Sequence, residues 1–239
     1  SDLDLKYTDV GFCFWSDHDG SKCDKAIKLF ANLDSKPGNR VFSGTFDGCS
    51  GLTGEIPADL FAGVAGAPEE YAFYMTFANC SGLTGEIPGD LFSGIKGAPA
   101  EGMFNDTFDG CSGLTGSIPA DLFSGIDGAP APRMFEGTFK GNINLTGSIP
   151  ATLFKGIRGA AATRMFENTF QNCSGLTGYI PAELFAGIPA EGYETGPMVD
   201  AFNGTKLEES CPIGMYKQEI SFDVDWDGKA MCNKCPTGT

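Results

Sequence analysis

The most constraining feature of the sequence is a unit of 31 residues that recurs without insertion or deletion. The string CSGLTGEIPADLFAG and its close variants start at Cys49, Cys80, Cys111, Asn142 and Cys173, so each start lies 31 residues after the previous one. Units of constant length can stack, because each presents the same cross-section for its neighbour to cover. The sequence therefore predicts a solenoid built from one repeating unit.

Fixed apolar positions predict an inner and an outer face within each unit. Leu and Ile recur four residues apart with Gly halfway between, which predicts a short extended segment whose Leu-Gly-Ile face points into the core. The opposite face then carries an outward row, here called the threonine strip: Thr53, Glu55, Thr84, Glu86, Thr115, Ser117, Thr146, Ser148, Thr177 and Tyr179. Because its second column varies on a fixed frame, we expect the strip to bind a protein or glycan ligand.

Two short helices per unit are expected on the remaining sides of the coil. Pro57 suits a first helical turn, and Leu60 follows at a helical offset. A second helix is expected to begin near Pro68, because Phe42 and Phe46 and their equivalents are i,i+4 pairs. Each unit alone would expose a one-sided apolar surface, so we expect stacking to supply the stability and the two ends to need caps.

The string TFDGCSGLTGSIP, followed by LFSGI, resembles the leucine-rich repeats of BspA-like, Treponema-type bacterial surface proteins. The first intervals of their shorter unit are kept here by Phe108, Cys111, Leu114, Ile118 and Pro119. The LTGxIP string is also similar to the plant-type repeat, but the preceding Asn-x-Leu frame is absent. The resemblance implies an α/β repeat solenoid, a right-handed coil with a parallel sheet on one face and short helices on the other. It also implies surface display and adhesion-like binding.

Three segments are expected along the chain. Residues 1–35 form an N-terminal cap, residues 36–207 the solenoid, and residues 208–239 a Cys-rich C-terminal hairpin module. Leu207 falls 31 residues after Leu176 and marks a degenerate sixth unit. The printed sequence begins at Ser1 with neither an initiator Met nor a signal-like apolar stretch, so we expect a processed or excised chain.

Four of the nine cysteines share one column of the repeat. These are Cys49, Cys80, Cys111 and Cys173, and Asn142 takes the fifth place. Asn and Cys can both bond local backbone groups in such a turn. Since one place lacks a thiol, we expect no pairing within the column and predict four free, buried thiols.

The other five cysteines lie in the flanks, where secreted repeat proteins place disulfide-closed caps. We pair Cys13 with Cys23. The tail CPIGMY…CNKCPTGT resembles small Cys-Pro-x-Gly modules of extracellular proteins, which implies a bond from Cys211 to Cys232 and leaves Cys235 for a partner outside the printed sequence. A redox or zinc site at Cys232 and Cys235 is disfavoured, because neither a second CxxC nor a nearby His is present.

A calcium site is considered at the D-x-D-x-D-G string formed by Asp223, Asp225 and Asp227. The twelfth position of such a loop would be Lys234 rather than a bidentate Glu. Alternating apolar residues and the Asp227-Gly228 turn signal instead favour a hairpin with its carboxylates in water. The hairpin is the preferred interpretation, and bound calcium is the alternative.

Charge and motif content limit the classes of function. The net charge of −15 disfavours nucleic acid and anionic membrane surfaces as partners. No apolar run approaches the roughly 20 residues that span a bilayer. No nucleophile elbow, phosphate loop, dinucleotide fingerprint or metalloprotease helix is present, and His18 is the one histidine. We therefore expect no enzymatic activity and no cofactor, but a secreted or cell-surface, adhesin-like binding module.

Two alternatives remain open. Near-identical units with small exposed residues are also compatible with a structural stalk or a self-assembling surface scaffold, in which the chain associates with itself. A regular row of threonines is what an ice-binding surface needs. However, Glu55, Glu86 and Tyr179 change the charge and identity of the neighbouring column, which disfavours ice binding.

Overall fold

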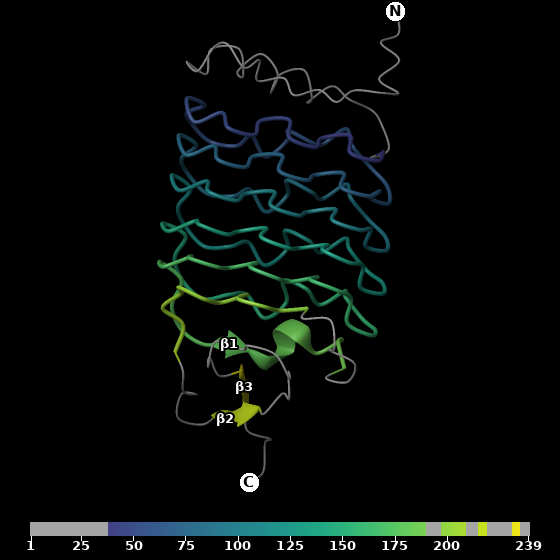
Figure 1. Cartoon of the computed structure of the whole chain (residues 1–239), viewed down its shortest axis with the longest axis vertical. Helices are drawn as coiled ribbons and strands as arrows, with labels where there is room; N and C mark the ends of the chain where they lie inside the picture. The colour runs from purple at the N-terminus through teal and green to yellow at the C-terminus, as the bar shows by residue number, and fades with distance from the viewer. Residues whose placement is uncertain (1–37, 190–196, 209–214, 219–230, 235–239) are drawn as a thin grey trace, which may run out of the picture.

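The structure is a computed structural model that describes residues 38–189, 197–208, 215–218 and 231–234. The chain winds into coils stacked along the long axis of the molecule (Figure 1). The coils comprise residues 38–68, 69–99, 100–130, 131–161 and 162–189, followed by a partial sixth at 197–208. Backbone hydrogen bonds link each coil to the next, and isolated parallel bridges, such as Gly54 to Leu83, do so elsewhere on the coil.

One side of each coil is a run of consecutive turns, here called the turn ribbon. It comprises residues 38–49, 69–80, 100–111, 131–142, 162–173 and 197–205. Its backbone N–H groups alternate in direction. The N–H groups of Ser43 and Thr45 donate three residues back within the coil, whereas those of Gly44 and Phe46 donate to carbonyls of the next coil. The ribbon is therefore held both locally and between coils, and its N–H groups are satisfied without a helix.

The helices expected from the Phe spacing are not formed, and that prediction is wrong. The one helix among the described residues is η1, a 3-10 helix over Ala182–Phe185. Along the ribbon, every fourth residue has a positive φ, 55° at Arg40 and 62° at Gly44, which a right-handed helix excludes. This conformation repeats every four residues, so Phe42 and Phe46 still face the same side.

The continuous parallel sheet expected along the threonine strip is reduced to isolated bridges. The central Gly of each LTG string has a positive φ, 92° at Gly54 and 75° at Gly116, and a strand cannot continue through that conformation. Leu52 and Ile56 are nevertheless buried on either side of Gly54, as expected. The sequence therefore predicts the burial of the Leu and Ile columns correctly, whereas the strand and the inward-facing glycine between them are predicted incorrectly, since Gly54 is exposed.

A three-stranded sheet lies at the C-terminal end of the stack (Figure 1). Strand β1 (Ile180–Pro181) pairs in parallel with β3 (Met231–Lys234), which pairs antiparallel with β2 (Met215–Gln218). The C-terminal segment thus docks on the last full coil through β3. Residues 219–230, which connect β2 to β3 and include the expected hairpin turn, lie outside the described residues.

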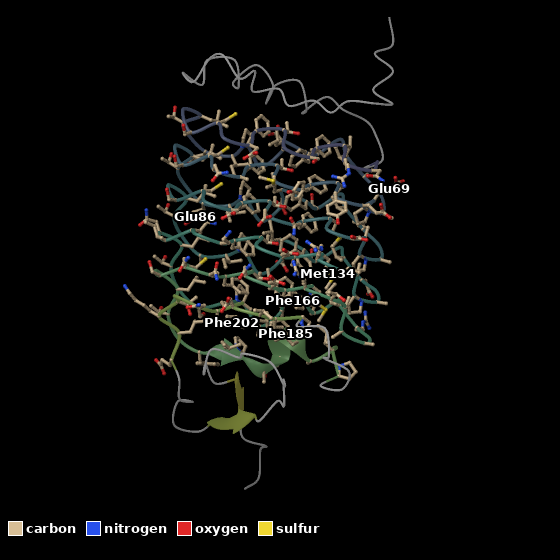
Figure 2. The ribbon with its side chains drawn as sticks, in the orientation of Figure 1. Glu69, Glu86, Met134, Phe166, Phe185 and Phe202 are labelled. Atoms are coloured by element: carbon tan, nitrogen blue, oxygen red, sulfur yellow. The ribbon has the colours of Figure 1, made fainter. Side chains whose placement is uncertain are left out.

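Phenylalanine columns run through the core along the stack. Successive rings within a column lie 5.2–6.2 Å apart with nearly parallel planes. The columns contain Phe42, Phe73, Phe104, Phe135 and Phe166; Phe46, Phe77, Phe108, Phe139, Phe170 and Phe202; and Phe61, Phe92, Phe123, Phe154 and Phe185. Figure 2 shows Phe166, Phe185 and Phe202 together in the interior. Burying one such side chain contributes about 1.5–3 kcal/mol.

Buried polar side chains join the coils beside these rings. The Thr76 hydroxyl donates to the carbonyl of Phe42 at 3.0 Å, and the Cys80 thiol donates to that of Phe46 at 2.9 Å. The same two bonds recur in the later coils. In the fourth coil, the amide of Asn142 makes the bond that a thiol makes elsewhere. The threonine column was missed in the sequence, although a Thr precedes the second Phe of every unit.

The cysteine column is only partly as expected. Cys80, Cys111 and Cys173 are free and buried, but Cys49 is disulfide-bonded, so the prediction of four free thiols is wrong. The thiols of Cys80, Cys111 and Cys173 each donate to a carbonyl of the preceding coil.

The other cysteine predictions fall largely on residues that the structure leaves undescribed. The predicted pairs Cys13–Cys23 and Cys211–Cys232 lie outside the described residues, apart from the backbone of Cys232 in β3. The N-terminal cap at residues 1–35 lies outside them as well. These assignments therefore stay predictions.

Candidate functional site

The threonine strip lies on the surface along the stack. All ten of its side chains are exposed except Tyr179, which is half-buried. The backbone N–H of Thr84 donates to the carbonyl of Gly54, and the same bond recurs at each later threonine of the strip. The hydroxyls of Thr115 and Thr146 also donate to backbone carbonyls of the preceding coil, at 3.2 and 3.3 Å. These bonds hold the threonines in register from coil to coil.

The charge of the strip changes along the stack. The Glu55 and Glu86 side chains each lie against the glycine of the next coil, so that a Cβ added to Gly85 or Gly116 would collide with them. In the next two coils, Ser117 and Ser148 take the place of these glutamates. A Cβ added to Gly147 or Gly178 would meet only the Cβ of the preceding serine, at an ordinary contact distance. Figure 2 shows Glu86 near one edge of the stack. The strip is therefore acidic toward the first coils and uncharged toward the last ones.

The fourth coil departs from the other units where the turn ribbon meets the strip. It carries Asn142, Ile143 and Asn144, where the other full coils carry Cys, Ser and Gly. Among the described residues, Ile143 is the one exposed large hydrophobic side chain, at 48% exposure. Asn142 is completely buried, and its amide nitrogen donates to the carbonyls of Phe108 and Phe139. We call these three residues the fourth-coil corner.

Aromatic and basic side chains lie on the outer face of the turn ribbon. The Arg40 guanidinium sits 4.4 Å from the centre of the Tyr71 ring, and the two tyrosine rings Tyr71 and Tyr74 meet edge to face at 5.8 Å. The Tyr71 hydroxyl donates to a carboxylate oxygen of Glu101 at 2.6 Å, and this bond raises the pKa of Tyr71. The cation–π contact and the hydrogen bond fix this cluster across three coils.

Acidic groups lie beside this cluster on the same face. Burial raises the pKa of Asp106 to about 6, and the neighbouring carboxylate of Asp109 adds to the rise. Burial also raises the pKa values of Asp109 and Glu136. Lys140 lies 3.3 Å from Asp109 and partly offsets the negative charge. This face is the competing candidate surface, because its outward positions differ from coil to coil.

Two structural features, a cluster of metal-ligating side chains and a membrane-spanning helix, are absent from the described residues. Within residues 38–189, 197–208 and the described strand segments, no group of three or more His, Cys, Asp or Glu side chains could hold a metal ion. The calcium alternative at Asp223, Asp225 and Asp227 lies outside the described residues. Nor does any described helix have the length and apolar character needed to cross a bilayer.

Comparison with known protein families, with curated protein sequences and with solved structures finds no match to this chain. The assignment of a function therefore depends on the chemistry of the exposed surfaces.

Proposed function

We propose that the chain is a non-catalytic binding module of the leucine-rich-repeat class, displayed outside the cell, that recognises a protein or glycan through the threonine strip. The observation that supports this proposal most is that an exposed column of side chains varies between coils while the buried columns stay the same. The Leu52, Ile56 and phenylalanine columns of the core keep their identity in all five full coils, whereas the strip changes from Glu to Ser to Tyr. Such diversified positions on a rigid scaffold are typical of partner recognition.

The stacked coils and their shared core support the proposed class. The turn ribbon and the isolated bridges differ from the helices and sheet that the class implies. Right-handed winding stays a prediction. Backbone hydrogen bonds from the threonines of the second to fifth coils to the preceding coil make the strip a rigid platform, which lowers the entropy lost on binding.

Charge along the strip suggests how a partner is oriented. Glu55 and Glu86 favour a polar or basic part of the ligand at the first coils. Tyr179, half-buried at the other end, has the character of an interface anchor, because aromatic side chains dominate interface energetics.

The test is binding of the purified chain to arrays of glycans and of extracellular proteins. For any ligand found, we expect Tyr179→Ala and Glu86→Lys each to weaken binding about tenfold or more without lowering the melting temperature. The control is Arg133→Ala on the turn ribbon, which should leave affinity unchanged. If Arg133→Ala weakens binding and the two strip variants do not, recognition lies on the turn ribbon and the strip is only scaffold.

A structural or self-assembling scaffold is the second candidate. It is favoured by the near identity of the coils and by the small hydroxyl side chains of Ser117 and Ser148. Sedimentation over a range of concentrations separates the candidates, since a scaffold should form oligomers and a binding module should remain a monomer. Ice binding is the weakest candidate, because Glu55 and Glu86 place charge beside the threonines.

A further inference from the structure

We propose that the fourth-coil corner, formed by Asn142, Ile143 and Asn144, is the centre of recognition on the threonine strip, and that it takes an uncharged segment of a protein partner whose apolar pocket receives Ile143. This inference rests on the proposed function. It adds the place of contact and the class of the ligand.

The first argument is that the fourth coil loses stability at this corner. The amide nitrogen of Asn142 is satisfied, but its buried amide oxygen has no hydrogen-bond partner. A thiol, as in Cys111 and Cys173, needs only the one acceptor that the preceding coil supplies. An unsatisfied buried acceptor costs free energy of folding. The exchange of Cys for Asn therefore leaves a buried acceptor unpaired that the thiol does not have.

The second argument concerns the place of Asn144. Its equivalents in other coils are glycines that touch the preceding coil. A Cβ added to Gly82, Gly113 or Gly175 would collide with backbone carbonyl oxygens there, such as that of Leu83 above Gly113. Asn144 carries a Cβ at this position, and its amide nitrogen donates to the carbonyl of Ser112 at 2.8 Å. The fourth coil therefore carries a side chain at a position where the close contact between coils favours glycine.

The third argument is the exposure of Ile143. The equivalent residues of the other full coils are serines, so the isoleucine adds a half-exposed apolar group to the surface. Three consecutive departures from a repeat that is otherwise strict at these positions, one of which leaves a buried acceptor unpaired, indicate selection for function. A single exposed aliphatic side chain is common on protein surfaces and would carry no inference without the other two departures.

The chemistry of the corner identifies the ligand class. The strip residues of the fourth and fifth coils, Thr146, Ser148, Thr177 and Tyr179, carry no charge, although the chain as a whole has a net charge of −15. An aliphatic side chain offers no hydrogen bond to a sugar hydroxyl, and its natural complement is an apolar pocket lined by protein side chains. The hydroxyls of Thr146 and Ser148 and the side-chain carbonyl of Asn144 can form hydrogen bonds with a polypeptide backbone. These features together favour a neutral protein segment over a glycan.

The experiment restores the repeat sequence at this corner. The triple variant Asn142→Cys, Ile143→Ser, Asn144→Gly gives the fourth coil the residues of its neighbours. Random peptides displayed on phage are selected on the whole wild-type chain, and each enriched peptide is then tested on the variant. We expect uncharged peptides with aliphatic or aromatic residues, at least about tenfold weaker binding to the variant, and a higher melting temperature for the variant.

Two matched variants make the result specific. Ile143→Ser alone should account for most of the loss of binding. Adding Ser174→Ile to the triple variant places an isoleucine at the same column one coil later, and it should not restore binding. Restoration would mean that any exposed apolar group suffices, which overturns the inference.

The remaining outcomes separate this inference from the proposed function. One outcome is that the peptides bind the triple variant and the wild type equally tightly but lose affinity for Glu86→Lys. That result overturns the role of the fourth-coil corner and leaves the threonine strip as the binding surface. Enrichment of no peptide, together with no ligand on the arrays, contradicts both. If the wild type is a dimer and the triple variant is a monomer, the corner binds a second copy of this chain, and the inference of a foreign protein partner is overturned. A triple variant less stable than the wild type overturns the stability argument.

Discussion

Asp106 lies half-buried on the turn ribbon, where Asp109, Glu136 and Asp47 add negative charge and Lys140 partly offsets it. Its pKa of about 6 exceeds the usual value of about 3.9 for Asp. The folded chain therefore binds this proton more tightly than the unfolded chain. The free energy of unfolding should rise as the pH falls from about 6 toward about 4, and the cost of the charged form is fully present at pH 7.

Asp106→Asn removes this cost. At about 1.4 kcal/mol per pKa unit, and with a discount for partial exposure, it should raise the free energy of unfolding by about 1–2 kcal/mol at pH 7. It should also flatten the pH dependence of stability between about pH 4 and 6. Urea unfolding at several pH values measures both effects, with exposed Asp121→Asn as the control. An unchanged pH profile would show that Asp106 titrates normally in the folded chain.

The thiols of the cysteine column give a second prediction at this scale. Burial raises the pKa of Cys80 and of Cys173 to about 12 and that of Cys111 well above its usual value. Only a thiolate reacts readily with an alkylating reagent, and access also requires exposure. Iodoacetamide at pH 8 should therefore leave these three residues unmodified until denaturant is added, and mass mapping should find Cys49 in a disulfide. Rapid labelling of Cys111 in the native chain would contradict the buried column.

At the scale of elements, the turn ribbon shows why burial was predictable from the sequence and backbone conformation was not. A helix and a four-residue turn period both bring Phe104 and Phe108 to one side, so the apolar pattern cannot separate them. The third coil does carry a signal that separates the turn period from a helix. Gly102, Asp106 and Gly110 are spaced four residues apart, and Gly and Asp adopt the left-handed conformation more readily than other residues. Elsewhere the signal is hidden, because Tyr71 and its equivalents Arg40, Arg133 and Arg164 adopt the same positive φ.

The phenylalanine columns give a prediction about the stability of the packed elements. Phe108 is completely buried and stacks on Phe77 at 5.5 Å and on Phe139 at 5.9 Å. Phe108→Ala should lower the free energy of unfolding by about 3–5 kcal/mol, because the cavity lies between two neighbouring coils. Equilibrium denaturation measures the change, with exposed Ser124→Ala as the control. A loss of less than about 1 kcal/mol would mean that the column does not bear on stability.

At the scale of the whole molecule, the repeat period predicted which residues meet, and deviations from it mark the candidate site. Exposure of the strip followed from its alternation with Leu and Ile, and the structure agrees except for half-buried Tyr179. The fourth-coil corner could not be recognised as costly from sequence. Its cost lies in the unsatisfied buried oxygen of Asn142, which is a property of the packed structure and not of the residue pattern.

The coil stack also predicts that whole units can be removed. Deleting Cys80 to Gly110 takes out 31 residues and joins Asn79 to Cys111, so that Phe73 and Phe77 would meet Phe135 and Phe139 in the same columns. The shortened chain should fold cooperatively, and its urea m-value should fall by about a fifth, because m scales with the surface buried.

The matched control deletes Cys80 to Gly94, which shifts every later column out of register and should leave the chain unable to form the stack. Far-ultraviolet circular dichroism and urea titration measure both variants. If the half-coil deletion were as stable as the whole-coil deletion, the contacts between equivalent positions in successive coils would not be what stabilises the fold.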